Sequence, residues 1–176
     1  MSYAARLERH RADIARFTAR ERQISIARLI AIAAAIVAGY FWGWLMLVPV
    51  IAFVALVIAH EPAIAAKRRA TAAAAFCERG IARMSNAWRG RGDRGAEFAD
   101  DHHPFSGDLD LFGEGSLFEL VSIATTSAGR RILAELFQSP RGDVRERQQA
   151  VDELRDRLDL REELAVLAAE VRGGIE

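Results

Sequence analysis

The chain has 176 residues with 24 basic and 24 acidic side chains, so its formal net charge at pH 7 is zero. A neutral balance excludes overall charge as a reason for binding nucleic acid or an acidic partner. The single cysteine, Cys77, excludes an internal disulfide and has the character of a small apolar helix residue.

Residues 1–23 predict a basic amphipathic helix. Tyr3, Leu7, Ile14 and Phe17 recur at helical spacing, while arginines occupy the other faces. The pattern leads without a break into a much more apolar stretch.

Residues 24–59 carry one charged side chain, Arg28. One continuous helix of this length would extend about 54 Å, well beyond the hydrocarbon core of a bilayer at roughly 30 Å. The stretch divides at Gly39 and Gly43, where a tight turn is expected. A belt of interfacial aromatic side chains surrounds this point: Tyr40, Phe41, Trp42 and Trp44. We therefore predict a transmembrane hairpin of two helices.

Two other interpretations of residues 24–59 fit less well. A buried hairpin of a soluble helical protein would need more chain than remains to cover two helices that are apolar on all sides. A cleaved signal peptide would not follow so many polar residues or precede a second span. Both spans are short, so full crossing and a re-entrant dip into one leaflet both stay open.

Basic residues on both sides of the hairpin predict its orientation. Those before or at its start are Arg6, Arg9, Arg11, Arg16, Arg20, Arg22 and Arg28, and those after it are Lys67, Arg68 and Arg69. The turn between the spans carries no charge, so the positive-inside rule places both termini in the cytoplasm. Arg28 can extend its head group back to that interface, and the basic residues suit anionic lipid head groups.

Residues 60–97 predict a helical stalk and a linker rich in glycine and arginine. Pro62 sits where a first-turn proline is tolerated, and an alanine-rich helix then runs to about Met84. The two stalk helices are expected to continue the membrane helices and to pack side by side. Small side chains would let them approach closely: Ala65, Ala66, Ala72, Ala73 and Ala74. No heptad is sustained long enough for a true coiled coil. Residues 85–107 fit either a linker or an ordered loop.

Residues 98–176 predict a small helical domain, so an all-α fold is expected for the whole chain. Capping residues mark the helix starts, which are Ser116 with Glu119, Thr126 or Ser127, Asp143 with Glu146, and a last start near Asp159. Pro140 ends the second of these helices. One short extended piece is expected at Asp108–Phe112.

Three motif-like clusters suggest ligand sites, and each has a simpler explanation. Residues 90–95 match G-x-G-x-x-G, but a dinucleotide site needs a preceding strand and a following helix, so a basic loop is expected, with phosphate contacts by its arginines as the alternative. A calcium-loop spacing at Asp108, Asp110, Gly113 and Glu119 is broken by Phe112, which offers no oxygen ligand. The cluster of Asp100, Asp101, His102 and His103 resembles metal ligands but is expected to be a solvated loop.

No metalloprotease, serine-hydrolase or P-loop motif occurs in the sequence. We therefore assign no catalytic, cofactor-binding or metal-ligating residue to this chain.

One ordered series of residues within 98–170 resembles the start of the core domain of MutS-like mismatch-repair proteins. The series is His103-Pro104-Phe105, Asp108-Leu109-Asp110-Leu111-Phe112-Gly113, Gly115-Ser116-Leu117-Phe118, Thr125-Thr126, Gly129-Arg130-Arg131, Leu133 and Ser139-Pro140, continued by Arg147-Gln148, Ala150-Val151 and Glu153-Leu154. With its preceding hairpin, the chain resembles the bacterial branch in which membrane helices precede the MutS core.

The resemblance implies a helical lever region that transmits motion between a DNA-embracing clamp and a dimerising P-loop ATPase. ATP and Mg²⁺ would then belong to a full-length relative, because this sequence contains no Walker motif. The resemblance also implies the bacterial inner membrane as location and a truncated or split product. The family residues have ordinary structural roles too: Gly129 would allow tight helix packing, and three arginines would pair at the surface, namely Arg130, Arg131 and Arg147 with Glu135, Asp152 or Glu153.

Two functional hypotheses follow. The first is the anchor and lever part of a membrane-bound MutS-like protein, whose partners would be the lipid bilayer, a homodimer mate or a P-loop ATPase portion, and DNA through the parent family. The second is a non-enzymatic membrane scaffold that binds anionic lipid and a protein partner. Both predict the same properties for these residues: membrane localisation, helix-mediated contacts and no turnover.

Overall fold

The computed structural model describes residues 2–100, 102–139 and 141–173, and these residues form helices and loops with no β-strand among them. The predicted all-α class is confirmed. The chain forms two compact units. We call Ala5–Ala74 the hairpin unit, and Met1–Ala4 with Ala75–Glu176 the head unit.

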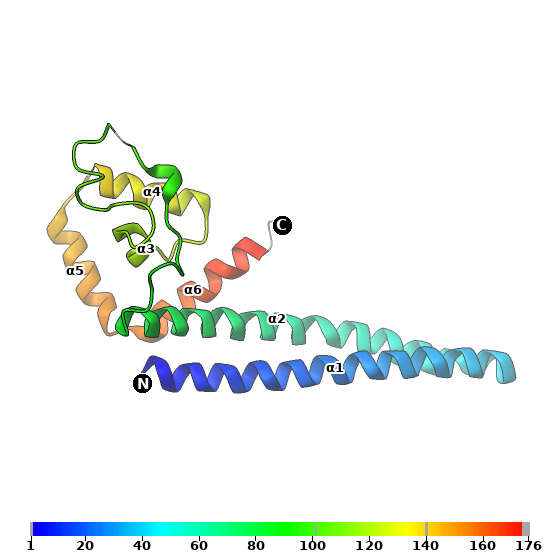
Figure 1. Cartoon of the computed structure of the whole chain (residues 1–176). Helices are drawn as coiled ribbons and strands as arrows, with labels where there is room; N and C mark the ends of the chain where they lie inside the picture. Colours follow the sequence, from blue (N-terminus) through cyan, green and yellow to red (C-terminus); the bar gives the residue numbers. More distant parts are fainter. Residues whose placement is uncertain (1, 101, 140, 174–176) are drawn as a thin grey trace. The chain divides into compact units, whose positions relative to one another are not determined.

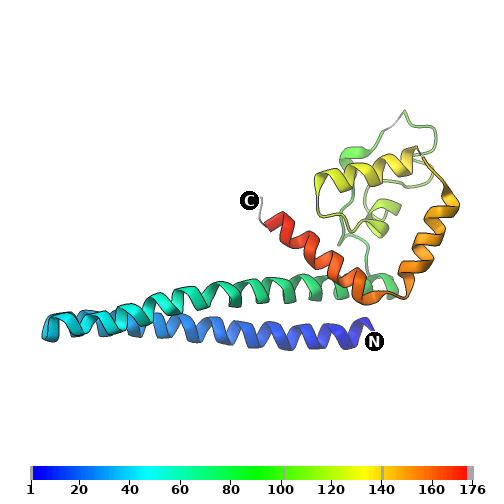
Figure 2. The same cartoon turned by 180° about the vertical axis from the view of Figure 1, so that it is seen from behind.

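Two long helices make the hairpin unit. Helix α1 spans Tyr3–Trp42, a short 3₁₀ helix η1 spans Gly43–Met46, and α2 spans Leu47–Met84. Gly43 has a φ of 53°, a left-handed conformation that glycine adopts without a steric cost. Figures 1 and 2 show the helices side by side and antiparallel in this unit. The turn therefore lies where the sequence predicted it.

Helix α2 continues from the apolar stretch into the stalk, as expected, but it passes through Pro62, so the expected first-turn position of this proline is wrong. Proline has no N–H to donate and is unfavourable inside a helix by about 3 kcal/mol. Here Pro62 is exposed, while its neighbour Ala63 is only 6% exposed. We attribute the continuity to α2 packing along α1, which outweighs one missing backbone hydrogen bond.

A seam between the two helices runs through parts of the stalks and through the apolar stretches. Buried and half-buried positions alternate at spacings of three and four along both helices, at Ile14, Phe17, Glu21, Ile24, Arg28, Ala31, Ala35 and Ala38 on α1, and at Pro49, Phe53, Leu56, His60, Ala63, Lys67 and Ala70 on α2. This spacing is typical of a two-helix seam. Hydrophobicity alone hides it because alanine and polar residues occupy many of the positions. Ala65, expected in the contact, is exposed.

Polar side chains pair across this seam. Lys67 Nζ donates a hydrogen bond to Glu21 Oε2 over 2.6 Å, with each side chain about one-third exposed. The Arg28 guanidinium lies 5.3 Å from the ring centroid of Phe53, so it contacts the opposite helix instead of extending back along its own. Polar residues at such positions select one register, because sliding the helices would separate them.

Four α-helices and one 3₁₀ helix follow in the head unit: η2 Ala96–Phe98, α3 Leu117–Val121, α4 Ser127–Gln138, α5 Val144–Arg155 and α6 Leu158–Gly173. The predicted caps are confirmed for three of the α-helices. Ser116 Oγ accepts from the N–H of Glu119 over 3.2 Å and Thr126 Oγ1 from that of Gly129 over 3.1 Å. Asp143 Oδ1 accepts from the N–H of Arg145 over 2.7 Å.

The extended piece expected at Asp108–Phe112 is wrong. Residues 108–110 form successive turns, with the N–H of Leu109 donating to Phe105 O and the N–H of Asp110 donating to Gly107 O, both over 3.1 Å. Asp110 has a φ of 46°, a left-handed conformation that ends any extended backbone.

Phe118 is the centre of the head unit. Its side chain is fully buried, and its ring centroid lies 5.7 Å from that of Phe98, 5.6 Å from Phe112 and 6.2 Å from Phe137. The rings come from η2, the turn before α3, and α4, so one side chain joins segments that are distant in sequence. Tilted and edge-to-face pairs of this kind add to the free energy of burial.

Gly95 lies so close to the Phe118 ring that a larger side chain would not fit there. It has a φ of 57°, and a Cβ at this residue would lie 2.6 Å from Phe118 Cδ1. We expect Gly95→Ala to lower the free energy of unfolding of the head unit by about 1–3 kcal/mol, since both the backbone and the ring must shift. Gly107→Ala is the matched control, because a Cβ there meets nothing within 4 Å. Equal stability of the two variants in urea unfolding would contradict this fit.

Candidate functional site

The surface of the hairpin unit is apolar on all sides along residues 24–59. In the most apolar segment of each helix, only 11% of the residues of α1 and 6% of those of α2 are buried. Both helices are long and apolar enough to cross a membrane. Leu29 and Ile58 illustrate this, with 68% and 69% of their side chains exposed. An exposed apolar surface of this extent marks contact with a membrane or a protein partner.

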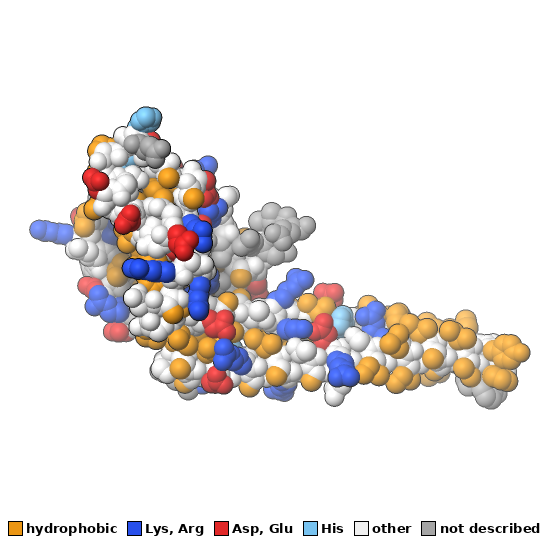
Figure 3. Space-filling model, viewed as in Figure 1, with side chains coloured by type: hydrophobic (Ala, Val, Ile, Leu, Met, Phe, Trp, Pro, Cys, Tyr) orange, Lys and Arg blue, Asp and Glu red, His pale blue; other side chains and the backbone are white. Residues whose placement is uncertain are grey.

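Aromatic side chains are exposed at the turn. Tyr40 is 84% exposed and Trp44 is 77% exposed, and Tyr40 packs edge-to-face on Phe41 with 4.9 Å between ring centroids. In Figure 3 apolar side chains cover the end of the hairpin, and charged side chains begin only further along it. Amphipathic aromatic rings at the tip and basic side chains at the other end are typical of a membrane-inserted hairpin.

The glycine-rich loop at residues 90–95 is ordered around a carboxylate of the protein itself. The N–H of Gly92 donates to Glu119 Oε1 over 2.9 Å, and the N–H of Gly115 donates to Glu119 Oε2 over 2.7 Å. The backbone of Gly90 bonds the same carboxylate. Converging backbone N–H groups form an anion-binding concavity. In this chain Glu119 fills the concavity that a dinucleotide motif would offer to phosphate.

This arrangement modifies the predicted capping box. Ser116 caps α3 as expected, but Glu119 bonds the glycine amides instead of the N–H of Ser116. Its side chain is only 3% exposed. Burial alone would raise the pKa of Glu119, but hydrogen bonds from Gly92, Gly115 and Gly90 and the charge of Arg94 lower it below the ordinary value of 4.5.

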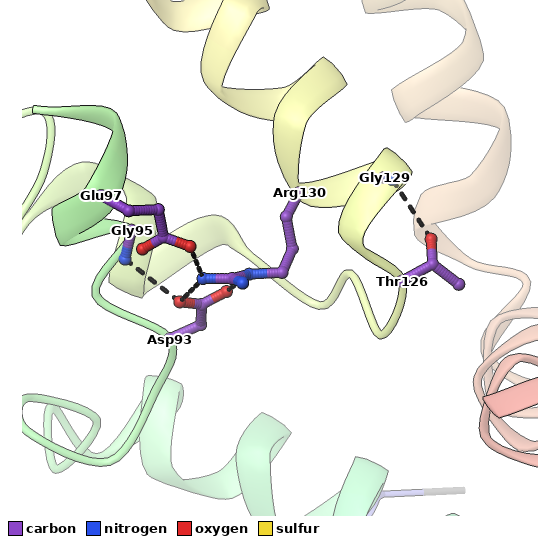
Figure 4. A network of polar contacts seen from close by, with 6 residues as sticks. All are labelled: Asp93, Gly95, Glu97, Thr126, Gly129 and Arg130. Atoms are coloured by element: carbon purple, nitrogen blue, oxygen red, sulfur yellow. Dashed lines mark hydrogen bonds and ion pairs between the residues drawn. The ribbon is translucent and has the colours of Figure 1, made fainter. Parts of the chain in front are cut away.

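A second network fixes the same loop to α4 (Figure 4). Arg130 Nη2 donates to Asp93 Oδ1 over 2.8 Å, its Nε donates to the other oxygen of Asp93, and the guanidinium also pairs with Glu97. Asp93 in turn accepts from the N–H of Gly95 over 3.1 Å. Burial would raise the pKa of Asp93, but the hydrogen bonds from Arg130 and Gly95 lower it below 3.8.

The surface pair expected for Arg130 is wrong. Arg130 pairs with Asp93 and Glu97, which precede it in sequence. Asp152 pairs with Arg155 over 2.8 Å, and Glu153 with Arg157 over 3.1 Å. Neighbours three or four residues along one helix face each other, and this explains the latter pairs.

Gly129 was expected to allow tight packing between helices, and its close contact in the structure is a different one. A Cβ there would lie 3.1 Å from Thr126 Oγ1, so the close approach is to the helix's own cap.

Residues of the other two motif-like clusters also have partners within the protein. Glu119 is engaged by glycine amides, so the calcium-loop spacing does not gather its carboxylates. His103 Nε2 lies 3.0 Å from Gln138 O, and its ring packs on Phe105 with 4.3 Å between centroids, while His102 is exposed. Asp101 lies outside the described residues.

Acid should weaken the head unit. The pKa values of Asp93 and Glu119 are lowered in the folded state, so both carboxylates stabilise the fold above their unfolded values of 3.8 and 4.5. That contribution is lost as the pH falls through the folded values. We expect amide hydrogen exchange in residues 88–122 to accelerate below about pH 4 once corrected for intrinsic exchange. Unchanged protection at pH 3 would contradict this.

Sequence reasoning missed both carboxylate networks, although one signal was present. The sequence contains three glycines whose backbone N–H groups can converge on one point, and an acidic residue at the start of the following helix. The glycines supply hydrogen-bond donors and the acidic residue supplies the acceptor. Elsewhere in the described part of the chain, shifted pKa values also belong to groups with protein partners, including Glu21 with Lys67 and Arg83 near the carbonyls of Val121 and Ser122. The ionisable groups with shifted pKa values therefore contribute to the structure of the protein through contacts with its other residues.

Comparison of the chain with protein-family models, with curated proteins and with solved structures finds no match in any of the three.

Proposed function

We propose that this chain is the membrane anchor and the first part of the core domain of a MutS-like protein, inserted in the bacterial inner membrane with both termini in the cytoplasm. One observation carries the proposal: three residues of the MutS-like series lie in the interior of the head unit, while others, such as Leu109 and Val151, are exposed at its surface. Leu111 is 3% exposed, Ser116 is 1% exposed and Phe118 is fully buried.

Further residues of the series have defined structural roles. The N–H of Gly113 donates to Arg94 O over 2.8 Å, and Gly113 has a φ of 108° that favours glycine. Arg130 ties α4 to the glycine-rich loop. Matching residues that a local fold requires are stronger evidence of a shared fold than the same number of matching residues at the surface.

In such an assembly this chain would position other parts. The hairpin holds the protein in the membrane, and the head unit connects the anchor to a region that binds DNA and hydrolyses ATP with Mg²⁺. Those reactions would belong to residues of a longer chain or of a partner with a P-loop.

The proposal is tested on the native protein. An antibody against the head unit should recover, from detergent-solubilised source membranes, either a polypeptide larger than 19.4 kDa or a complex with a P-loop protein. The recovered material should hydrolyse ATP, while the recombinant 176-residue chain should not. A native polypeptide of 19.4 kDa that associates with no ATPase would overturn the MutS-like part of the proposal.

The anchor is tested by a charge in the exposed apolar surface. Ile36 is 69% exposed on α1, so Ile36→Asp should weaken membrane insertion by about 3 kcal/mol. Ile132→Asp is the matched control, since Ile132 is 56% exposed on α4 in the head unit. Alkaline extraction should release the first variant and leave the second in the membrane pellet. Full retention of Ile36→Asp would count against a spanning hairpin.

A scaffold function is the second candidate, and it is favoured by one specific observation. Helix α5 is exposed along its whole length, and its apolar residues Val144 and Val151 are 58% and 59% exposed. Such a face favours contact with another protein. In the affinity experiment above, a native 19.4 kDa chain recovered with a partner that lacks ATPase activity would support the scaffold.

A further inference from the structure

The hairpin unit carries a concentration of positive charge where its apolar surface begins. Residues 16–28 and 60–69 contain seven basic and two acidic side chains, in a chain whose formal net charge is zero. The Lys67–Glu21 pair places these two stretches at the same level of the hairpin. The positive charge therefore forms a band across both helices.

The inward-facing charges of this band are already engaged. Glu21 bonds Lys67 across the seam, and this hydrogen bond and the charge of Lys67 hold the pKa of Glu21 below its ordinary value. Arg28 lies against Phe53. Only Glu61 remains as an exposed acid in the two stretches. The surface of the band is therefore strongly basic.

Four exposed arginines make up this surface, and we call them the arginine collar: Arg16, Arg20 and Arg22 on α1, and Arg68 on α2. At about 100° of helix rotation per residue, Arg20 and Arg22 leave α1 roughly 160° apart. Arg68 adds charge on the other helix, next to the exposed Arg69. The collar therefore has arginines on opposite sides of α1 and on α2, instead of forming a patch on one side.

We propose that the arginine collar binds the phosphate groups of anionic phospholipids in the leaflet where the two helices enter. A guanidinium donates two parallel hydrogen bonds to phosphate, which suits a lipid head group better than a single point charge would. Charges on several sides match a membrane surface pierced by the hairpin, whereas a DNA duplex would contact one side. The inference rests on the membrane insertion proposed above and adds which residues bind the lipid phosphates.

The test uses the full chain in a neutral detergent, with phosphatidylglycerol or phosphatidylcholine added and bound lipids counted by native mass spectrometry. We expect the chain to retain phosphatidylglycerol in preference to phosphatidylcholine. Changing all four collar arginines to glutamine should weaken phosphatidylglycerol binding by at least about tenfold, since each basic residue contributes at an anionic surface. Changing the four to lysine keeps the charge but loses the paired hydrogen bonds, so it should weaken binding less than the change to glutamine does.

The matched control replaces four exposed arginines of the head unit by glutamine: Arg91, Arg131, Arg141 and Arg145. It makes the same change in net charge and should bind phosphatidylglycerol as the unmodified chain does. Equal weakening in the collar variant and this control would overturn the proposal, as would equal retention of the two lipids.

Two further experiments test whether the arginine collar binds phosphate groups from a source other than lipid. Inorganic phosphate should not displace the lipid, and a DNA duplex should not bind collar arginines in phosphatidylcholine nanodiscs. Collar-dependent binding of either one in place of the lipid would overturn the proposal. Alkaline extraction separates a failure of the proposed membrane anchor from a failure of the proposed lipid binding. Release of the unmodified chain from the membrane would contradict the anchor. A chain that stays in the membrane but binds both lipids equally would contradict only the lipid binding by the arginine collar.

Discussion

Phe118→Ala is expected to lower the free energy of unfolding of the head unit by about 3–5 kcal/mol, the largest effect of any single truncation. Phe118 is fully buried and contacts the rings of Phe98, Phe112 and Phe137. Removing it leaves a cavity between η2, the turn before α3, and α4. Phe98 and Phe112 also pack on each other, with 6.2 Å between ring centroids, but among the described residues only Phe118 packs on all three rings, so we expect the segments to separate together.

The measurement is hydrogen–deuterium exchange on the full chain in detergent, followed in peptides from residues 94–138. Protection should fall in all of these peptides in Phe118→Ala. Leu117→Ala is the matched control, since Leu117 is the preceding residue of α3 and is 41% exposed. A loss of protection confined to α3, or equal in both variants, would show that Phe118 does not join the three segments.

Glu119→Gln is expected to destabilise the head unit by about 3 kcal/mol, although it only replaces one carboxylate oxygen by an NH₂ group. The carboxylate accepts the N–H of Gly92 on one oxygen and the N–H of Gly115 on the other. Whichever way an amide turns, its NH₂ group faces one of these donors. The variant therefore loses charge-assisted hydrogen bonds, worth about 1.5–3 kcal/mol each, and leaves a buried N–H without an acceptor.

Glu114→Gln provides the comparison for this substitution. Glu114 pairs with Arg94 over 3.1 Å, but its side chain is 65% exposed, and such pairs contribute about 0–1 kcal/mol. Urea unfolding should therefore separate the two glutamine variants clearly. The Glu119 variant should also lose the Glu119 part of the acid sensitivity expected below about pH 4, since glutamine does not titrate there, while the part that depends on Asp93 remains. Similar midpoints for the two variants would mean that the glycine loop is ordered without Glu119.

The glycine-rich loop shows how a functional motif can be satisfied internally. Residues 90–95 match a dinucleotide pattern, and their amides do converge on an anion, as the motif requires. The anion is the side chain of Glu119. Sequence spacing describes the donors, but only the fold decides which acceptor reaches them.

The sequence by itself determined the all-α class, the two apolar helices with their turn near Gly43, and the helix starts at Ser116, Thr126 and Asp143. These features depend on local causes: side-chain apolarity, backbone freedom of glycine, and capping oxygens within three residues of the N–H they accept. They are therefore visible in short windows of sequence.

Only the tertiary structure decided how the helices and loops are joined. The seam of the hairpin includes Glu21 and Lys67, whose charges suggest solvent until each is seen to face the other. Arg130 reaches Asp93, and Glu119 reaches Gly92, over separations of 37 and 27 residues. Such contacts form because burial excludes water and leaves each charge or N–H group dependent on a partner inside the protein. No local pattern specifies that partner, so the fold alone assigns it.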